Sequence, residues 1–241
     1  MGNAKDIYFK SILNISDQYF PFPTKQNIPD WYKNTKPYYD DQSILTKSMS
    51  STIKKCIPIF DAMTSGYIIT TYCDIYVNNA KIIDPEDQIK KNFTKIVSSD
   101  EHFKSIEFHS KEQIDKYPLF DGEDAPKFIS PWQIITPKGY SCLFVNPMHN
   151  LNKDFTILEG IVDTDQYSGP VNFPFIFKNK DFKGIIPAGT PIVQVIPFKR
   201  DSWKIKITEA DQKEFMQNQK TLVSVFKNRY KKFFWSSKEY N

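Results

Sequence analysis

Residues 132–199 constrain the fold of this chain more than any other part of its sequence. Short runs of β-branched and aromatic residues alternate there with Pro, Gly, Asn and Asp, which is the pattern of successive strands joined by tight turns. Pro174 cannot donate a hydrogen bond to a ladder, so its strand is expected at an edge or a bulge. We predict strands at 132–136, 140–145, 155–162, 171–177, 182–186 and 191–198.

The whole chain is expected to be mainly β, as an antiparallel β-sandwich or jelly roll. Aromatic residues make up 15% of the 241 residues, including 20 Phe and 13 Tyr, and such side chains suit a pleated, half-buried surface. The net charge of +4 is too mild for the basic surface of a nucleic-acid-binding protein. Nucleic acid is therefore not an expected partner.

Three segments are expected along the chain. Residues 1–50 are rich in Pro and aromatics and predict an irregular arm packed on the domain, because dense prolines interrupt helices and central strands. Residues 51–207 predict the β domain with one short helix, which Pro58 breaks or restarts. A long strand is expected at 67–77, a loop at 117–130 and a last strand at 203–207.

The final segment, residues 208–241, predicts an amphipathic helix of roughly 25 residues and a tail. Thr208 and Asp211 resemble a capping box at its start. Aromatic side chains recur on one face of this helix, among them Phe226, Tyr230 and Phe233. Such a face is expected to pack on the domain or on a partner.

Motifs for common enzyme chemistries are missing from the sequence. It contains no GxSxG, no GxxxxGK[ST] and no GxGxxG pattern. The three histidines and three cysteines show no metal-ligand spacing, so neither a metal nor a cofactor is expected. These residues are His102, His109, His149, Cys56, Cys73 and Cys142.

No apolar run approaches the roughly 18 residues that cross a bilayer, and no signal-peptide core is visible. We therefore expect no membrane contact and a cytoplasmic location, which for a phage-encoded protein means the host cytoplasm or the virion.

One constellation of polar residues stands out inside the strand-rich stretch. Asp163, Asp165 and Tyr167 follow a predicted strand, and Gln194 lies within a later one. In the simpler interpretation the two aspartates cap a turn through their side chains, and Gln194 faces solvent. In the other interpretation the four residues form a ligand-binding site.

The same stretch resembles the dUTPase and dCTP deaminase superfamily. There a strand ends in a Gly-hydrophobic-hydrophobic-Asp-x-Asp-Tyr-x-Gly loop, and a later strand opens Gly-x-x-Ile-Ala-Gln; residues 160–169 and 189–196 are similar. The resemblance implies a jelly-roll-like fold in which Asp163 and Tyr167 hold a deoxyribose and position water. The chain departs from the pattern at Gln166, an extra residue before the tyrosine, and at 146–149, which read Asn-Pro-Met-His instead of Pro-Arg-Ser-Gly.

A second resemblance covers residues 30–205 and concerns a family of uncharacterised bacterial and phage proteins, known as a domain of unknown function. It rests on short motifs that include Cys56-x-Pro58, Thr136-Pro137-x-Gly139-Tyr140 and Gly189-Thr190-Pro191. This resemblance implies a shared architecture and assigns no reaction.

Two functions stay open at this point. The first is a non-catalytic binding or assembly protein, with a phage-encoded structural or accessory protein as one form, that contacts a protein partner or a second copy of itself. Aromatic side chains are enriched at interfaces, and the candidates here are Trp31, Tyr32, Tyr38, Tyr39, Phe226, Tyr230 and Phe233. The second is a nucleotide-binding or dUTPase-like nucleotide-hydrolysing enzyme, in which Asp163 orients water or sugar and Tyr167 stacks on the sugar.

Overall fold

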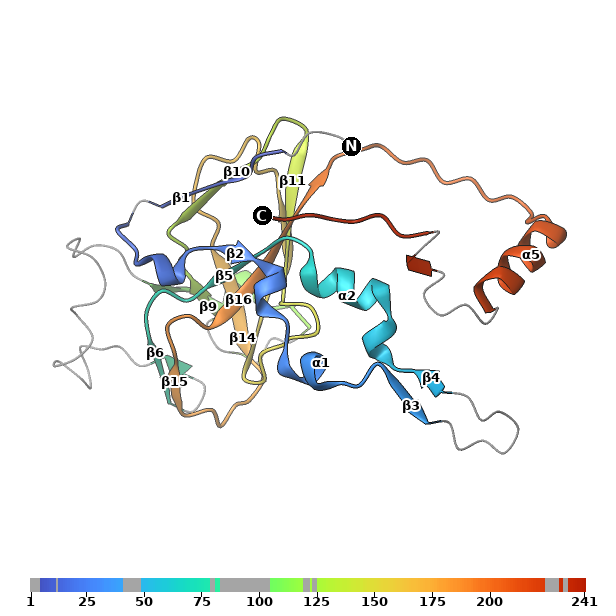
Figure 1. Ribbon diagram of the computed structural model, residues 1–241. Coiled ribbons are helices and arrows are strands. Elements are labelled where there is room, and N and C mark those ends of the chain that lie inside the picture. The colour runs from blue at the N-terminus through green and yellow to red at the C-terminus, as the bar shows by residue number, and fades with distance from the viewer. Residues whose placement is uncertain are drawn as a thin grey trace.

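The two longest strands, β11 (Tyr140–Val145) and β16 (Pro191–Lys199), pair at the centre of a five-stranded antiparallel sheet in the computed structural model (Figure 1). The sheet order is β13 (Gly160–Val162), β11, β16, β5 (Tyr67–Thr70) and β2 (Phe22–Pro23). The structure describes residues 5–11, 13–40, 49–78, 81–82, 105–118, 122, 125–223, 230–231 and 234–241.

A four-stranded antiparallel sheet has the order β12 (Phe155–Ile157), β14 (Phe173–Phe177), β9 (Ala125–Phe128) and β8 (Ile106–His109). A three-stranded sheet has the order β15 (Gly184–Ile186), β6 (Ile75–Asn78) and β7 (Lys81–Ile82). Two further sheets have two strands each: β1 (Tyr8–Ser11) pairs with β10 (Trp132–Ile135), and β3 (Tyr38–Asp40) pairs with β4 (Met49–Ser51). The predicted mainly β, antiparallel class is confirmed. The arrangement as a sandwich or jelly roll stays a prediction.

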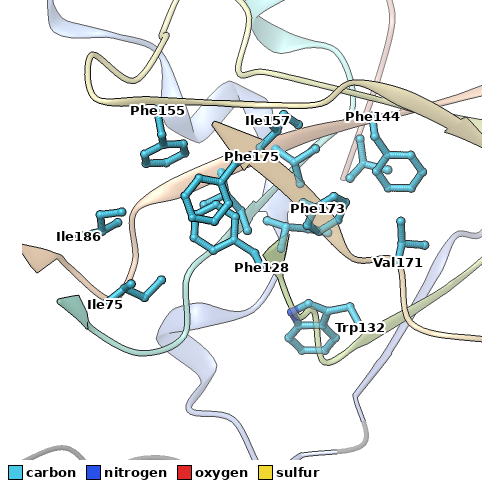
Figure 2. Packing of buried hydrophobic residues seen from close by; sticks show 14 of the residues in the cluster. Ile75, Phe128, Trp132, Phe144, Phe155, Ile157, Val171, Phe173, Phe175 and Ile186 are labelled. Atoms are coloured by element: carbon cyan, nitrogen blue, oxygen red, sulfur yellow. The ribbon is translucent and has the colours of Figure 1, made fainter. Parts of the chain in front are cut away.

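Phenylalanines from both larger sheets meet in one buried cluster (Figure 2). Phe128 and Phe175 of the four-stranded sheet stack with ring centroids 4.0 Å apart, and Phe155 meets Phe175 edge-on at 5.5 Å. Phe144 of β11 lies 5.7 Å from Phe173 of β14, so the cluster joins the two sheets. Each ring removes about 150–250 Å² from water, which makes the cluster a major source of hydrophobic stabilisation.

Helices are short in the described part of the chain. They are η1 (Asp17–Tyr19), η2 (Thr24–Asn27), α1 (Asp30–Asn34), η3 (Ile53–Lys55), α2 (Ile57–Thr64), α4 (Lys111–Ile114) and α5 (Gln212–Val223). Pro58 occupies the first turn of α2, where a missing N–H breaks no helical hydrogen bond. The interpretation that Pro58 starts a helix is therefore confirmed.

Two strand predictions and one loop prediction differ from the structure. The run at 67–77 is divided between β5 and β6, and the run at 155–162 between β12 and β13, which belong to different sheets. The first break lies at Thr71, whose N–H donates to Thr190 O and whose hydroxyl donates to Pro187 O. The predicted loop at 117–130 contains β9, whose Pro126 lies opposite Phe108. The sequence hides such corners, because strand-forming residues continue through a bend at which the chain changes its hydrogen-bonding partner.

The predicted last strand at 203–207 is wrong, since residues 201–211 join no strand among the described residues. The predicted helix starts later than expected. Asp211 is its N-terminal cap, because its Oδ1 accepts from the N–H groups of Lys213 at 2.8 Å and Glu214 at 3.1 Å. No helix in the described residues is long and apolar enough to cross a membrane.

Candidate functional site

The acidic turn after β13 is anchored by an arginine that ends the central sheet. Arg200, the residue after β16, makes a bidentate pair with Asp165, with Nη2–Oδ2 and Nη1–Oδ1 distances of 2.5 and 2.7 Å. The Gly139 N–H also donates to Asp165 Oδ2 at 2.7 Å. The Asp165 side chain is only 3% exposed. Hydrogen bonds from Arg200, and then from Gly139, lower the pKa of Asp165 to about 2.

Asp163 takes a different position, at the surface. Its side chain is 56% exposed, its Oδ1 accepts from Ser141 Oγ at 2.6 Å, and the Arg200 Nη1 lies 3.3 Å away. The turn itself is closed by the Asp163 carbonyl, which accepts from the N–H groups of Gln166 and Tyr167 at 2.9 Å. The interpretation that both aspartate side chains cap this turn is therefore wrong, because they bond to neighbouring elements.

Tyr167 is 47% exposed and held in place by its own loop. Its hydroxyl donates to the Pro170 carbonyl at 3.1 Å, and its ring covers Gly169. A Cβ on Gly169 would lie 2.6 Å from the phenol oxygen, so a larger residue there would displace the Tyr167 ring. The ring is thus presented to solvent in a fixed orientation.

Asp163 and Tyr167 line one open hollow of about 570 Å³, which we call the β13 hollow. Its other walls include Ile161 of β13, His109 of β8 and Lys127 of β9. Lys127 lies opposite Glu107 in the ladder, and its Nζ is 2.9 Å from Glu107 Oε2. The hollow therefore brings an exposed carboxylate, an aromatic ring and two nitrogen-bearing side chains to one surface.

Sequence reasoning missed Lys127 as the basic group beside the acidic turn. Lys127 lies in a segment that the sequence predicted to be a loop. In the structure it belongs to β9, where its side chain and that of the next residue, Phe128, lie on the two different faces of the sheet. His109 was noted only as one of three histidines. Its Nδ1 lies 3.2 Å from Gln113 Oε1 at the start of α4.

Gln194 is not brought to this hollow. It is 0% exposed, so the expectation that it faces solvent is wrong. Its Oε1 accepts from the Met148 N–H at 2.9 Å, and its Nε2 donates to the carbonyls of Ala62 at 2.8 Å and Ser65 at 2.7 Å. The side chain ties β16 to the end of α2 and to the loop after β11.

The described residues contain no group of three His, Cys, Asp or Glu side chains placed to hold a metal ion. The cysteines are free thiols, of which Cys73 and Cys142 are buried. Burial raises the pKa of Cys142 to about 11, despite a hydrogen bond from Thr164, so this thiol stays protonated at neutral pH.

A second surface feature begins directly after Arg200. Residues 201–223, which we call the C-terminal arm, run from β16 to α5 and stand apart from the sheets (Figure 1). Trp203, Ile205 and Ile207 alternate with lysines along it and are 91%, 83% and 90% exposed. Phe215 and Met216 of α5 are also exposed.

The chain returns to the body after the arm. Trp235 Nε1 donates to both carboxylate oxygens of Asp61 in α2, at 3.0 and 2.9 Å, and Lys238 Nζ lies 2.6 Å from the same carboxylate. The Tyr240 ring meets Tyr67 of β5 edge-on at 5.9 Å. Trp235, Lys238 and Tyr240 are therefore fixed on the body, while the apolar side chains of the arm are in water.

The predicted interface aromatics occupy different environments. Tyr32 is buried and its hydroxyl donates to the Lys54 carbonyl, whereas Tyr39 is exposed. Trp31 is also exposed, and its Nε1 donates to the His149 carbonyl at 2.8 Å. Tyr38 is half-buried, Tyr230 is exposed, and Phe226 and Phe233 lie outside the described residues.

No protein-family model and no curated protein matches this chain. The two resemblances noted from the sequence therefore stay predictions. The arguments below rest on the β13 hollow and the C-terminal arm themselves.

Proposed function

We propose that this protein is a non-catalytic assembly protein that associates with a second copy of itself through the C-terminal arm. The observation that carries the proposal is the nearly complete exposure of Trp203, Ile205 and Ile207. Burying one isoleucine-sized side chain is worth about 1.5–3 kcal/mol. Single exposed apolar residues are ordinary, but an apolar face repeated along an extended segment is typical of a surface that a partner covers.

The alternation along the arm supports a protein partner. In an extended backbone Trp203, Ile205 and Ile207 would lie on one side, and Lys204 and Lys206 on the other. A strand has this pattern when one of its faces is buried and the other is in water. An extended segment of this kind can add to an existing sheet or groove and supply alternate side chains to it.

The apolar area on the arm is of the same order as one side of a standard interface. Five exposed apolar side chains, each offering on the order of 100–200 Å², approach the roughly 800 Å² that each partner buries in a standard interface. These side chains are Trp203, Ile205, Ile207, Phe215 and Met216. A role in a phage particle is one form of this proposal and rests on the sequence resemblance alone.

Light scattering coupled to size exclusion tests the proposal on the full chain. The wild-type protein should be dimeric, and the double variant Ile205→Lys/Ile207→Lys should be monomeric but fully folded, because these side chains touch no core, with a melting temperature that no longer depends on protein concentration. Leu151→Lys, at another exposed apolar side chain outside the arm, is the matched control and should stay dimeric. A wild-type protein that is monomeric at every concentration would refute the proposal.

The β13 hollow supports a second candidate, the binding of a nucleotide. Asp163 and Tyr167 lie at one surface with Lys127, whose ammonium group would have to leave its pair with Glu107 to meet a phosphate. The hollow falls within the roughly 300–1,000 Å³ of typical small-molecule sites. Arg200 does not complete a phosphate site, because its guanidinium is paired with Asp165.

A thermal-shift screen with deoxynucleotides and Mg²⁺ tests this candidate. A ligand at a hundred times its Kd adds about 2.7 kcal/mol of stability, which raises the melting temperature by about 5–10 °C for a chain of this size. The shift should disappear in Lys127→Met and persist in Lys111→Met, an exposed lysine of α4 that does not line the hollow. The absence of a shift with every nucleotide would remove this candidate.

A further inference from the structure

We infer that the β13 hollow binds a neutral saccharide. Such a site is independent of the proposed self-association, and its ligand differs in class from the nucleotide of the second candidate function. Three features of the lining residues point to it. They are an exposed aromatic ring, hydrogen-bonding groups of both kinds, and charges that disfavour an anion.

The Tyr167 ring provides a stacking surface at the hollow. It lines the hollow, is 47% exposed and is held by the bond from its hydroxyl to the Pro170 carbonyl. The face of an aromatic ring carries partial negative charge, which attracts the partly positive C–H groups on the flat side of a sugar ring. Ile161, which is 62% exposed, and Pro174 extend this surface with aliphatic carbon. Because the ring is fixed before binding, little conformational entropy is lost when a ligand covers it.

Asn172 and Asp163 supply a donor and an acceptor to the hollow. Asn172 Oδ1 accepts from the Ser130 N–H at 3.0 Å, which fixes the amide so that Nδ2 remains as a donor. Asp163 Oδ1 accepts from Ser141 Oγ at 2.6 Å. Its Oδ2 bonds to no group among the residues that the structure describes, so it remains as an acceptor.

His109 adds a second acceptor to the lining. Gln113 Oε1 accepts from the Ser110 N–H at 2.9 Å, so it is the amide oxygen that lies 3.2 Å from His109 Nδ1. Nδ1 must therefore carry the proton that points toward this oxygen, and Nε2 of the neutral ring is an acceptor. A hydroxyl group both donates and accepts, so a ring with several hydroxyls can use both kinds of group in this hollow.

The charges around the hollow disfavour an anionic ligand. The carboxylates of Asp163 and Asp165 share the guanidinium of Arg200, which leaves negative charge in surplus on this side of the hollow. The Lys127 ammonium lies 2.9 Å from Glu107 Oε2, and its side chain is only 19% exposed. A phosphate would therefore be repelled by Asp163 and would have to break an existing ion pair, whereas an uncharged ligand meets neither cost.

The shape of the hollow favours a sugar ring over a nucleobase. Its volume of about 570 Å³ is that of a small-molecule site, but it is open to solvent. Among the described residues that line it, Tyr167 supplies the single phenyl-type ring. A planar base has two apolar faces to remove from water, whereas a sugar ring needs one covered face and can keep its outer hydroxyls hydrated.

Binding assays with the full chain test the inference. The probes are neutral oligosaccharides immobilised as an array, among them glucans, xylans, mannans and chitin oligomers, and the strongest binder is then titrated in a calorimeter. At least one should bind, and its Kd should stay unchanged from roughly 0.05 M to roughly 0.5 M NaCl, because salt does not screen an uncharged ligand. Thymidine and thymidine monophosphate, titrated in parallel, should bind at least about tenfold more weakly.

Two substitutions locate the binding at the hollow. Tyr167→Ala removes the ring and should raise the Kd at least about tenfold. Tyr39→Ala removes a tyrosine of β3 that is 54% exposed and does not line the hollow, so it is the matched control and should leave the Kd unchanged. Asn172→Asp keeps an oxygen for the Ser130 N–H but replaces the Nδ2 donor by an acceptor, so it should weaken binding by a similar factor at an unchanged melting temperature.

An array on which no neutral saccharide binds would overturn the inference, and so would binding that tolerates both Tyr167→Ala and Asn172→Asp. Tighter binding of thymidine or its monophosphate than of any saccharide would overturn it in favour of a nucleoside or nucleotide ligand. The proposed self-association is measured separately, since light scattering on the protein without ligand does not depend on any of these results.

Discussion

Replacing Gln194 by Met should destabilise the protein strongly, because its amide satisfies three backbone groups inside the molecule. The carboxamide accepts from the Met148 N–H and donates to the carbonyls of Ala62 and Ser65, at distances of 2.7–2.9 Å. Methionine fills a similar volume but can make none of these bonds. The perturbation therefore isolates the polar contribution from the packing contribution.

The magnitude follows from the number of groups left without partners. A buried donor or acceptor that loses its partner costs about 1–3 kcal/mol, so three such groups span about 3–9 kcal/mol. Met148, Ala62 and Ser65 are only partly buried, so water reaches some of the freed groups and brings the cost toward the lower end. We expect the free energy of unfolding to fall by about 3–5 kcal/mol.

Urea denaturation with linear extrapolation measures this loss. Gln26→Met, at an exposed glutamine of η2, is the matched control and should change stability by less than about 0.5 kcal/mol. A loss below about 1 kcal/mol in Gln194→Met would refute the structural role. It would also reopen Gln194 as a ligand-binding residue, which should affect binding more than folding.

Gln194→Glu adds a test with a definite pH dependence. Its carboxylate would accept from the Met148 N–H but face the carbonyl oxygens of Ala62 and Ser65. Burial and these oxygens should raise the pKa of the new carboxyl in the folded state above its unfolded value near 4.3. A raised folded pKa means that stability is lost as pH rises, so this variant should be least stable at neutral pH and recover in acid.

Three further predictions concern other parts of the fold. The pKa of Asp165 is about 2 in place of 3.8, so its pair with Arg200 should stabilise the protein above about pH 4. This stabilisation should be lost as pH falls toward 2, and the stability of Asp165→Asn, measured by acid denaturation, should not show this loss. Phe175→Ala should lower the free energy of unfolding by about 3–5 kcal/mol, measured in urea, because the ring is fully buried. Gly66→Ala should prevent stable folding, since φ is 78° and the new Cβ would lie 2.0 Å from the carbonyl oxygen of Val195 in β16. Gly139→Ala, at φ 86° in open space, is the control and should lower the free energy of unfolding in urea by only about 1–2 kcal/mol.

The local pattern predicted the strands best where turn residues mark both of their ends. β11 has the predicted bounds of 140–145, because Gly139 precedes it and Pro147 follows shortly after. β16 extends one residue beyond the predicted 191–198. In both strands the signal is a run of apolar residues whose limits are set by neighbours in the sequence.

The site could not be predicted in the same way, because its contacts join residues far apart in the chain. Arg200 meets Asp165 across 35 residues, and Gln194 reaches Ala62 across 132. The polar character of Gln194 suggested a solvent-facing position, but three backbone partners make its burial favourable. Trp203 was predicted to lie in a strand but is exposed and pairs with no strand in the described residues. Alternation of apolar and polar residues shows that a segment could have an apolar face, but it does not show that a neighbouring strand is present to pair with it.

Arg200 connects the two surface features on which the functional proposals depend. It lies between the end of β16 and the start of the C-terminal arm, and its bidentate bond to Asp165 holds it against the acidic turn. The same guanidinium lies beside Asp163 on the rim of the β13 hollow. Any occupant of the hollow that displaces this contact would therefore act on the residue before the arm, which would link the two proposed functions.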